Sequence, residues 1–501
     1  MRSFSGATDP SVAARLDRLP ITKLHKRFAG VMALGNFFEI YELFLAGVLA
    51  TTLKTTFDLA GFELSLVLAS AFVGAFVGAV VIGRLADRVG RRTAYMVTLT
   101  LYSAATLGCA LSPDLWTLVI FRFVAGVGLG GELPVTDSFL GDILPPARRG
   151  YYVAWAFTGA YLAVPAVGFL GLVLMDGAPL GVAGWRWMFA IGSLGALLTF
   201  LVRRGLPESP RWLESVGRMA EADAVTSRFE RAAEAEGWTP PAISDEPERP
   251  DAGSPVEPVP VRAIFRRPLV RRTVIMAILW ILAPIGFYGF GNLATLVLAD
   301  KGFDLNTSLT YLTFSFIGYP LGSYLSVLIM ERAERKWILS ASLVGMAVSG
   351  LMYGSARSAA VIIASGFCFT VVANVMSNSG HIYQLEQFPT SVRTTATGWL
   401  YSLSRLSTAA APFYLVPLLD AYGAAVAFTV VAVAMLLAAV AVVFGVRTTG
   451  LGLEAISGPD RAAMVRPRGP AGATPPAGST SPVGPTPPVG SASPVIPENT
   501  R

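Results

Sequence analysis

Twelve apolar runs, each long enough to cross a lipid bilayer, recur along this chain of 501 residues. About 20 residues of helix, each rising about 1.5 Å, cross the hydrocarbon core of about 30 Å. Runs this long predict helices rather than the short alternating strands of a membrane barrel. We expect the spans at 28–52, 64–83, 93–112, 115–136, 151–174, 185–202, 273–298, 307–330, 337–355, 358–380, 395–419 and 423–446. The expected fold class is therefore all-α, an integral membrane protein with 12 transmembrane helices in two six-helix bundles.

The composition excludes several other classes of protein. Hydrophobic residues make up 53% of the chain and charged residues 14%, whereas soluble domains carry roughly 25% charged residues. The two cysteines, Cys109 and Cys368, lie in apolar runs, which excludes a disulfide scaffold and a zinc site built from cysteines. His25 and His381 are the only histidines, so a histidine-rich metal site is excluded as well. We expect no metal and no cofactor, and no enzyme activity, because no nucleophile–base pair or phosphate-binding loop occurs.

The basic residues lie mainly on one side of the predicted spans. Of the 39 Lys and Arg residues, 33 fall in the N-terminal segment, in every second loop and in the tail. The alternate loops hold only Lys54, Lys301 and Arg357. The positive-inside rule therefore predicts a multi-pass protein of the plasma membrane with both termini in the cytoplasm. The basic excess is explained by topology, so the expected partners are a lipid bilayer and a small molecule, and not nucleic acid.

Five regions follow from this reading. Residues 1–27 contain six basic residues and no early apolar core, so they predict a cytoplasmic segment rather than a signal peptide. The first six spans occupy 28–203 and the last six 273–446. Between them, 204–272 is expected to be a cytoplasmic loop with a short charged helix at 212–237 and a linker at 238–260. Residues 447–501 are expected to form a disordered cytoplasmic tail, since 457–501 hold 11 of the 34 prolines.

An internal repeat supports two halves. The run DRVGRR at 87–92 recurs 244 residues later as ERAERK at 331–336. DILP at 142–145, followed by Arg149, recurs at the same offset as EQFP at 386–389, followed by Arg393. Two matches at one offset predict a duplicated six-helix unit, which is the architecture of transporters that bind their substrate between the halves.

Four motifs make the resemblance specific. The segment GRLADRVGRR at 83–92 matches the motif between helices 2 and 3 of the major facilitator superfamily, and RFVAGVGLG at 122–130 resembles its helix-4 motif. PESPRWL at 207–213 resembles the marker after helix 6 of the sugar-porter and metabolite-symporter branches. VRTTGLGLE at 446–454 resembles a decayed copy of the second marker of those branches, which follows helix 12. The resemblance covers about residues 20–456 and implies a secondary active transporter.

Two carboxylates in the first span are the candidate proton carriers. Glu39 and Glu42 are three residues apart on one helix face, and ionised carboxylates in hydrocarbon are costly. Their segment, EIYELFLAG, resembles the helix-1 pattern of aromatic-acid/proton symporters, with Glu in place of Asp. The alternative is a glutamate that reaches interfacial water. Arg122 in span 4 is expected to pair with an acid or with helix carbonyls, and the resemblance implies proton coupling. Its alternative role is structural, tying span 4 to span 1.

Arg405 in span 11 is the candidate substrate anchor, because arginine can bind a carboxylate through two parallel hydrogen bonds. The resemblance points the same way, since organic-anion and aromatic-acid transporters carry a matching arginine. The alternative is charge balance against Glu39 or Glu42. Other polar and aromatic side chains could line the substrate site or bridge packed helices instead. These are Tyr401, Asn374, Asn378, Tyr288, Asn292, Trp155 and Tyr161.

The loop motifs are expected to form a gate, in which an acid accepts hydrogen bonds from a facing helix N-terminus in one conformation. The alternative is that the charges of these loops only set the orientation of the spans in the membrane. The gating candidates are Gly83, Asp87, Arg88, Gly90, Arg91, Arg92, Glu132, Asp142, Arg149, Glu331, Arg332, Glu386 and Arg393. Glu132 could also be merely interfacial. The glycine pairs Gly74/Gly78 and Gly126/Gly130 are expected to allow close helix packing.

The expected function is proton-coupled symport of a small organic metabolite, with a carboxylate favoured, by a monomeric protein with the proton as coupling ion. A sugar is less favoured, because the paired glutamines of sugar porters are absent from the segment APIGFYGFGN at 283–292. Proton-coupled efflux and a non-transporting membrane sensor remain alternatives.

Overall fold

The computed structural model describes residues 11–175, 177–239, 261–267, 269–330, 332–388 and 390–448. Most of the predicted linker, nearly all of the predicted tail and Glu331 lie outside these ranges. The side chains of Asp87 and Arg393 are likewise outside the described part.

The first half consists of six spans. They are α2 (Lys23–Thr56), α3 (Gly61–Val89), α4 (Arg91–Leu111), α5 (Leu115–Ile143), α6 (Pro146–Tyr161) with α7 (Ala163–Leu174), and α8 (Gly184–Arg203). The fifth span is divided because Pro165 has no N–H to bond with the carbonyl of Tyr161. A short 3₁₀ turn, η1 (Pro179–Gly181), precedes α8.

The second half repeats this plan. It contains α11 (Val270–Asp300), α12 (Leu305–Phe316) with α13 (Gly318–Ile329), α14 (Arg335–Ser355), α15 (Ala359–Gln387) and α16 (Thr390–Val443). The 3₁₀ turn η2 (Val261–Phe265) comes before α11.

The helix α16 accounts for two predicted spans. Its apolar part, Thr395–Val443, has 49 residues, about 73 Å of helix at 1.5 Å per residue and enough to cross the bilayer twice. Gly423 breaks it with a φ of 78°, a left-handed conformation that favours glycine. With ten other spanning segments, this gives the predicted twelve, and the described residues contain no β-strand. The all-α membrane fold is confirmed.

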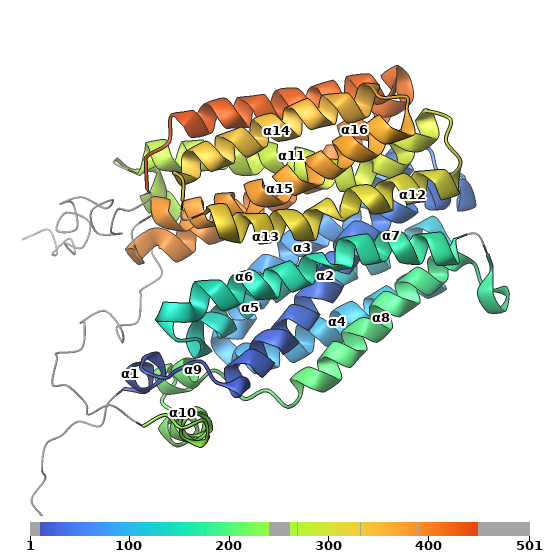
Figure 1. The fold of residues 1–501 in the computed structure, drawn as a ribbon. Helices are drawn as coiled ribbons and strands as arrows, with labels where there is room; N and C mark the ends of the chain where they lie inside the picture. Colours follow the sequence, from blue (N-terminus) through green and yellow to red (C-terminus); the bar gives the residue numbers. More distant parts are fainter. Residues whose placement is uncertain are drawn as a thin grey trace, which may run out of the picture. The chain divides into compact units, whose positions relative to one another are not determined.

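Three short helices gather at one end of the first half (Figure 1): α1 (Val12–Asp17), α9 (Pro210–Ser215) and α10 (Met219–Ala235). The predicted single helix at 212–237 is thus two helices. Arg15 of α1 pairs with Glu230 of α10 at 2.6 Å, which lowers the pKa of the Glu230 carboxyl. We call this end of the helices the basic end, and the end at which α2 finishes and α5 and α12 begin the opposite end.

Local sequence fixes the helix starts at the opposite end. Asp114 accepts a hydrogen bond from the backbone N–H of Thr117 at 2.9 Å, and Asp304 accepts one from Thr307 at 3.1 Å. These bonds favour the charged form and lower the pKa of both aspartates.

Glycine allows helices α3 and α5 to touch along their backbones. A Cβ on Gly74 would stand 2.1 Å from the carbonyl oxygen of Phe123, and one on Gly126 would stand 2.1 Å from that of Ala71. Neither position admits a side chain, so the predicted packing role of these glycines is confirmed.

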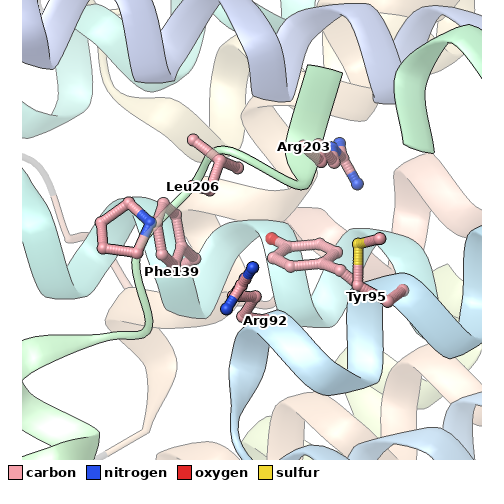
Figure 2. Close-up of a pocket in the computed structure, with 7 residues that line it drawn as sticks. Arg92, Tyr95, Phe139, Arg203 and Leu206 are labelled. Carbon is pink, nitrogen blue, oxygen red and sulfur yellow. The ribbon is translucent and has the colours of Figure 1, made fainter. Parts of the chain in front are cut away.

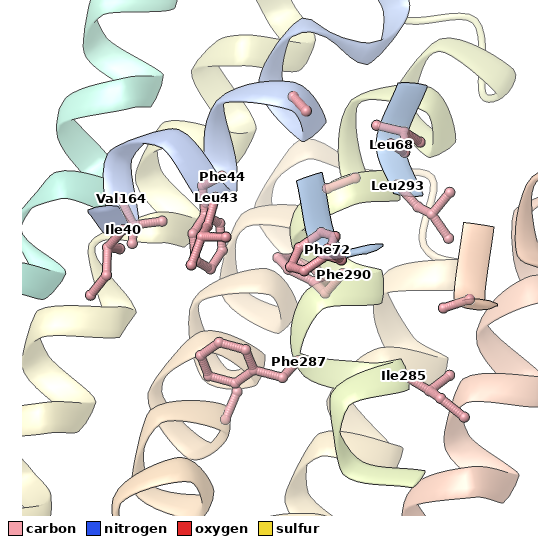
Figure 3. Packing of buried hydrophobic residues seen from close by; sticks show 14 of the residues in the cluster. Ile40, Leu43, Phe44, Leu68, Phe72, Val164, Ile285, Phe287, Phe290 and Leu293 are labelled. Atoms are coloured by element: carbon pink, nitrogen blue, oxygen red, sulfur yellow. The ribbon is translucent and has the colours of Figure 1, made fainter. Parts of the chain in front are cut away.

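The two halves meet mainly from mid-depth to the opposite end. Thr295 of α11 donates to the carbonyl oxygen of Gly47 at 2.7 Å, and Ser65 of α3 donates to that of Pro412 at 2.9 Å. Nearer the opposite end, Lys54 pairs with Asp420 at 3.0 Å. Figure 3 shows the apolar core that these contacts enclose, with side chains from α2, α3 and α7 packed among those of α11.

Candidate substrate and proton site

Glu42 of α2 and Arg122 of α5 form a buried charge pair within the first half. Glu42 Oε1 lies 3.7 Å from Arg122 Nη1, and each side chain is 1% exposed. Neither oxygen of Glu42 has a hydrogen-bond partner among the described residues. A buried carboxylate with one loose ionic contact can take up a proton with little rearrangement.

Arg122 is also tied to the helix backbone. Its Nε donates to the carbonyl oxygen of Val67 on α3 at 3.0 Å, and its guanidinium lies 6.0 Å from the ring of Phe189. Arg122 therefore contacts both an acid and a carbonyl, the two kinds of partner expected from the sequence.

Glu39, one turn earlier on α2, has different charged neighbours. It is 1% exposed and interacts electrostatically with Arg405 in the second half and with the hydroxyls of Tyr161 and Tyr401. The spacing of three suggested one shared carboxylate site. In the structure Glu42 faces Arg122, whereas Glu39 interacts with Arg405 and Tyr401 of the second half.

Arg405 of α16 is held by two tyrosines. Its Nη1 donates to the hydroxyl of Tyr288 on α11 at 3.0 Å, and its Nη2 donates to the hydroxyl of Tyr401. Arg405 is 3% exposed, and its Nε has no hydrogen-bond partner among the described residues. Two tyrosines chosen from the sequence thus come together around the buried cation of Arg405.

The other predicted substrate residues are distributed over a larger region. Asn374 is completely buried and neither amide atom is hydrogen-bonded within the described chain. Asn378 donates to Ser326 Oγ at 2.6 Å, and the ring of Tyr161 stacks on that of Tyr319 at 6.2 Å. These contacts place Asn378 and Tyr161 in side-chain bridges between helices.

Two further predicted residues are placed by other neighbours. Asn292 follows Gly291 where α11 crosses α2, since a Cβ on Gly47 would stand 2.7 Å from the Cα of Asn292. Trp155 is 47% exposed, and its ring is 6.2 Å from that of Tyr324 on the basic-end side of α6 and α13. The structure therefore does not gather every predicted residue in one site.

Sequence reasoning missed two side chains on α15. Ser377 interacts with the hydroxyl of Tyr161 in the other half, and the ring of His381 lies 4.8 Å from that of Trp280. With Asn374 and Asn378 they occupy positions i, i+3, i+4 and i+7 of one helix. That polar stripe in an apolar span was the available signal.

The gate motif of the first half is bound by the segment after α8. Glu208 accepts the backbone N–H of Arg92 at 3.0 Å, and Arg92 Nη2 donates to the carbonyl oxygen of Arg204 at 2.8 Å. Gly90 has a φ of 100°, and a Cβ there would stand 2.2 Å from Glu208 Oε2. Position 90 therefore requires glycine. Gly83 lies away from any such contact, since a Cβ there would meet nothing within 4 Å. The gating candidate Gly83 therefore makes no close approach to another helix in this structure.

Asp142 is the acid at the centre of this network. Ser209 Oγ donates to Asp142 Oδ2 at 2.6 Å, and Arg211 Nε donates to its carbonyl oxygen at 3.0 Å. Burial raises the pKa of Asp142, while Ser209 and the charges of Arg91, Arg211 and Arg149 oppose that rise. Arg149 itself donates to the carbonyl oxygen of Leu144 at 3.0 Å. Arg88, by contrast, is exposed.

Glu132 is buried and not interfacial. It is ion-paired with Arg203 of α8, and the two side chains are 5% and 1% exposed. Thr98 Oγ1 donates to Glu132 Oε2 at 3.3 Å, and Arg203 lies 4.6 Å from the ring of Tyr95. Figure 2 shows Arg203 of α8 beside Tyr95 and Arg92 of α4, with Phe139 of α5 opposite. The interfacial alternative for Glu132 is wrong, because Arg203 neutralises it inside the bundle.

The second half repeats the contacts of the gate motif with different residues. Arg335 Nε lies 3.2 Å from Glu386 Oε1, and these positions follow Arg91 and Asp142 by 244 residues. Glu334 stands where the first half has Gly90, and its Oε1 accepts the backbone N–H of Thr448 at 2.9 Å. The carboxylate thus comes from the loop itself instead of from the following segment. Arg332 is exposed.

Comparison with known proteins agrees with this architecture. The family described as sugar (and other) transporter matches residues 28–458. YyaJ, a Bacillus subtilis protein named for metabolite transport, is 32% identical over 79% of this chain and 86% of its own length. The niacin transporter NiaP of Acinetobacter baylyi is 29% identical over 89% of this chain and 99% of its own. Among solved structures, the xylose transporter XylE of Escherichia coli in a partially occluded inward-open conformation has a TM-score of 0.69. It is 19% identical over 85% of this chain and 99% of XylE.

Proposed function

The chain belongs to the sugar (and other) transporter family, and from that premise we propose that it carries a small organic carboxylate across the plasma membrane together with protons. As a member of this family it is a multi-pass membrane transporter of small metabolites and not an enzyme. The substrate class, the proton and the orientation are the parts that we propose.

The carboxylate is supported above all by Arg405. A buried guanidinium with two tyrosine hydroxyls as acceptors and a free Nε favours an anion that can accept charge-assisted hydrogen bonds. The relatives include a niacin transporter and a gentisate transporter of Corynebacterium glutamicum, the latter 27% identical over 82% of this chain and 85% of its own length. A neutral sugar would bring no negative charge of its own to pair with Arg405.

Proton coupling is supported by the Glu42–Arg122 pair. When Glu42 is protonated, its attraction to Arg122 falls, and a buried carboxyl is more easily neutral than ionised. Alternating access would expose Glu42 to each side in turn, so that protonation and release occur on opposite sides.

We propose that the basic end is cytoplasmic, because it carries α1, α10 and most of the Lys and Arg residues. The five regions at 1–27, 28–203, 204–272, 273–446 and 447–501 are then the N-terminal segment, first bundle, central loop, second bundle and tail. Contacts between the halves concentrate toward the proposed outside, which supports an inward-facing state.

Proteoliposomes test this proposal directly. Radiolabelled benzoate, succinate and xylose are offered with and without an inward proton gradient, to the unaltered protein and to Glu42→Gln. We expect the gradient to drive accumulation of a carboxylate, and Glu42→Gln to lose that accumulation while it retains exchange of labelled for unlabelled substrate.

Different uptake results would contradict different parts of the proposal. Uptake of xylose alone would refute the carboxylate and favour a sugar transporter. Carboxylate uptake that ignores the gradient, or that survives Glu42→Gln with full accumulation, would refute this proton carrier. Accumulation only under an outward gradient would indicate efflux.

A further inference from the structure

The polar face of α15, formed by Asn374, Ser377, Asn378 and His381, is oriented toward the first half and away from lipid. Asn374 and His381 are seven residues apart, two helical turns, and Ser377 between them interacts with the hydroxyl of Tyr161 of the first half. Cys368 is exposed on α15, and at 100° per residue it lies about 140° around the helix from His381. His381, which is also exposed, therefore faces the space between the halves.

The ring of Trp280 of α11 packs against the ring of this histidine. Their ring centroids are 4.8 Å apart, and a Cβ on Gly380 would lie 3.8 Å from the indole ring, so Trp280 packs closely on α15. Trp280 is 7% exposed, yet its Nε1 has no hydrogen-bond partner among the described residues. An indole N–H can only donate, so the pair offers an unused donor beside an imidazole that can donate or accept.

The pair lies near Arg405. The charge of Arg405 acts on His381, and Trp280 and Tyr288 are eight residues apart on α11, close to two turns. Because Tyr288 bonds Arg405, one side of α11 connects the cation to the Trp280–His381 pair. The rings of Tyr288, Tyr401 and Trp280 make the surroundings aromatic.

Resting on the proposed function, in which Arg405 binds the carboxylate, we propose that Trp280 and His381 form a second recognition point for a polar group on the substrate's ring. The substrate class that fits is a planar aromatic carboxylate bearing a ring hydroxyl or ring nitrogen. The acid group pairs with Arg405, and the ring packs against the aromatic side chains. The hydroxyl or nitrogen accepts from Trp280 Nε1 or bonds the imidazole of His381.

Binding of benzoate and 3-hydroxybenzoate to the purified protein tests the pair, measured by titration calorimetry. We expect the unaltered protein to prefer 3-hydroxybenzoate by about tenfold, the effect of one or two well-formed hydrogen bonds. His381→Phe retains a ring on Trp280 and removes the hydrogen bonding, so the preference should fall to about onefold to threefold while benzoate binds as before. His381→Asn should retain part of the preference. Cys368→Ser, on the other side of the same helix, should retain all of it.

Trp280→Phe gives an independent measurement, since it removes the indole N–H and preserves an aromatic ring. If His381→Phe does not fold, the preference of Trp280→Phe for 3-hydroxybenzoate tests the second recognition point by itself. Equal binding of the two acids by the unaltered protein would overturn the inference and leave carboxylate transport standing. An unchanged preference in both His381→Phe and Trp280→Phe would overturn it too. Failure of both acids to bind, with binding of xylose instead, would refute the proposed function and this inference with it.

Discussion

Arg203 of α8 and Glu132 of α5 are ion-paired inside the first half, and both side chains are almost completely buried. The pair lies between the gate residues at the basic end and Glu42 farther along the bundle. Arg203 also donates to the carbonyl oxygen of Met32 on α2 at 3.4 Å. One guanidinium therefore links α8, α5 and α2.

Loss of this cation should destabilise the protein strongly. Arg203→Met leaves Glu132 charged and buried without its partner, which typically costs about 3–5 kcal/mol. We expect a marked fall in the thermal unfolding midpoint of the detergent-purified protein. The double variant Arg203→Met/Glu132→Leu should recover much of the loss, because no buried charge remains. Arg204→Met, at the exposed neighbouring position, serves as the control. A midpoint equal to that of the unaltered protein in Arg203→Met would show that the pair contributes little.

A side chain at Gly35 should disturb the Arg203–Glu132 ion pair. A Cβ there would stand 1.9 Å from Arg203 Nη2 and 2.8 Å from Glu132 Oε1, so Gly35→Ala must displace the ion pair. We expect a loss of about 1–3 kcal/mol, as for other overpacked sites. Gly30→Ala on the same helix is the matched control, because a Cβ at Gly30 meets nothing within 4 Å and alanine favours a helix over glycine. Thermal unfolding of the two variants side by side would reveal the difference, and equal midpoints would contradict the steric argument.

Asp142→Asn should separate stability from transport. Burial raises the pKa of Asp142 above its ordinary value of 3.8, so the native state binds this proton more tightly than the unfolded chain. The ionised group thus weakens the fold at neutral pH, and stability returns as the pH falls through the raised pKa. We expect Asp142→Asn to unfold at the same temperature or a higher one, with a smaller pH dependence. Transport should nevertheless fall, because the charge that attracts Arg91 and Arg211 is lost. The exposed Asp223→Asn should leave transport intact, whereas a clear loss of stability in Asp142→Asn would reverse the sign argued here.

The sequence was sufficient for the features that depend on length and repetition. Twelve spans follow from apolar runs that only helices can satisfy in lipid. The offset of 244 residues also predicted that the loop of Arg335 repeats the loop of Arg91 and that the loop of Glu386 repeats the loop of Asp142. In the structure Arg335 and Glu386 lie 3.2 Å apart. Arg405 stood out because a cation inside an apolar run needs a partner.

Side-chain partners between helices were beyond the sequence. Arg203 lies at the end of its span, and in the sequence it was counted among the basic residues of the following loop. No local sequence pattern links it to Glu132, which is 71 positions earlier. The spacing of Glu39 and Glu42 likewise placed them on one face but could not show which neighbouring helix each would meet. Those contacts depend on how α2 is rotated between the two halves.

Glu39 and Glu42 should therefore respond differently to neutralisation. Glu39 interacts with Arg405, so its negative charge competes with a bound carboxylate. Glu39→Gln should tighten carboxylate binding by about tenfold, equivalent to about 1.4 kcal/mol. Glu42 faces Arg122 at 3.7 Å, and Glu42→Gln should leave affinity within about twofold, because the charge of Glu42 acts mainly on Arg122 and the acid that acts on Arg405 is Glu39. Titration of benzoate into both variants at one pH distinguishes them. If Glu39→Gln binds benzoate more weakly than the unaltered protein, Glu39 supports the substrate site instead of competing with it, and the assignment of separate roles to these two carboxylates is wrong.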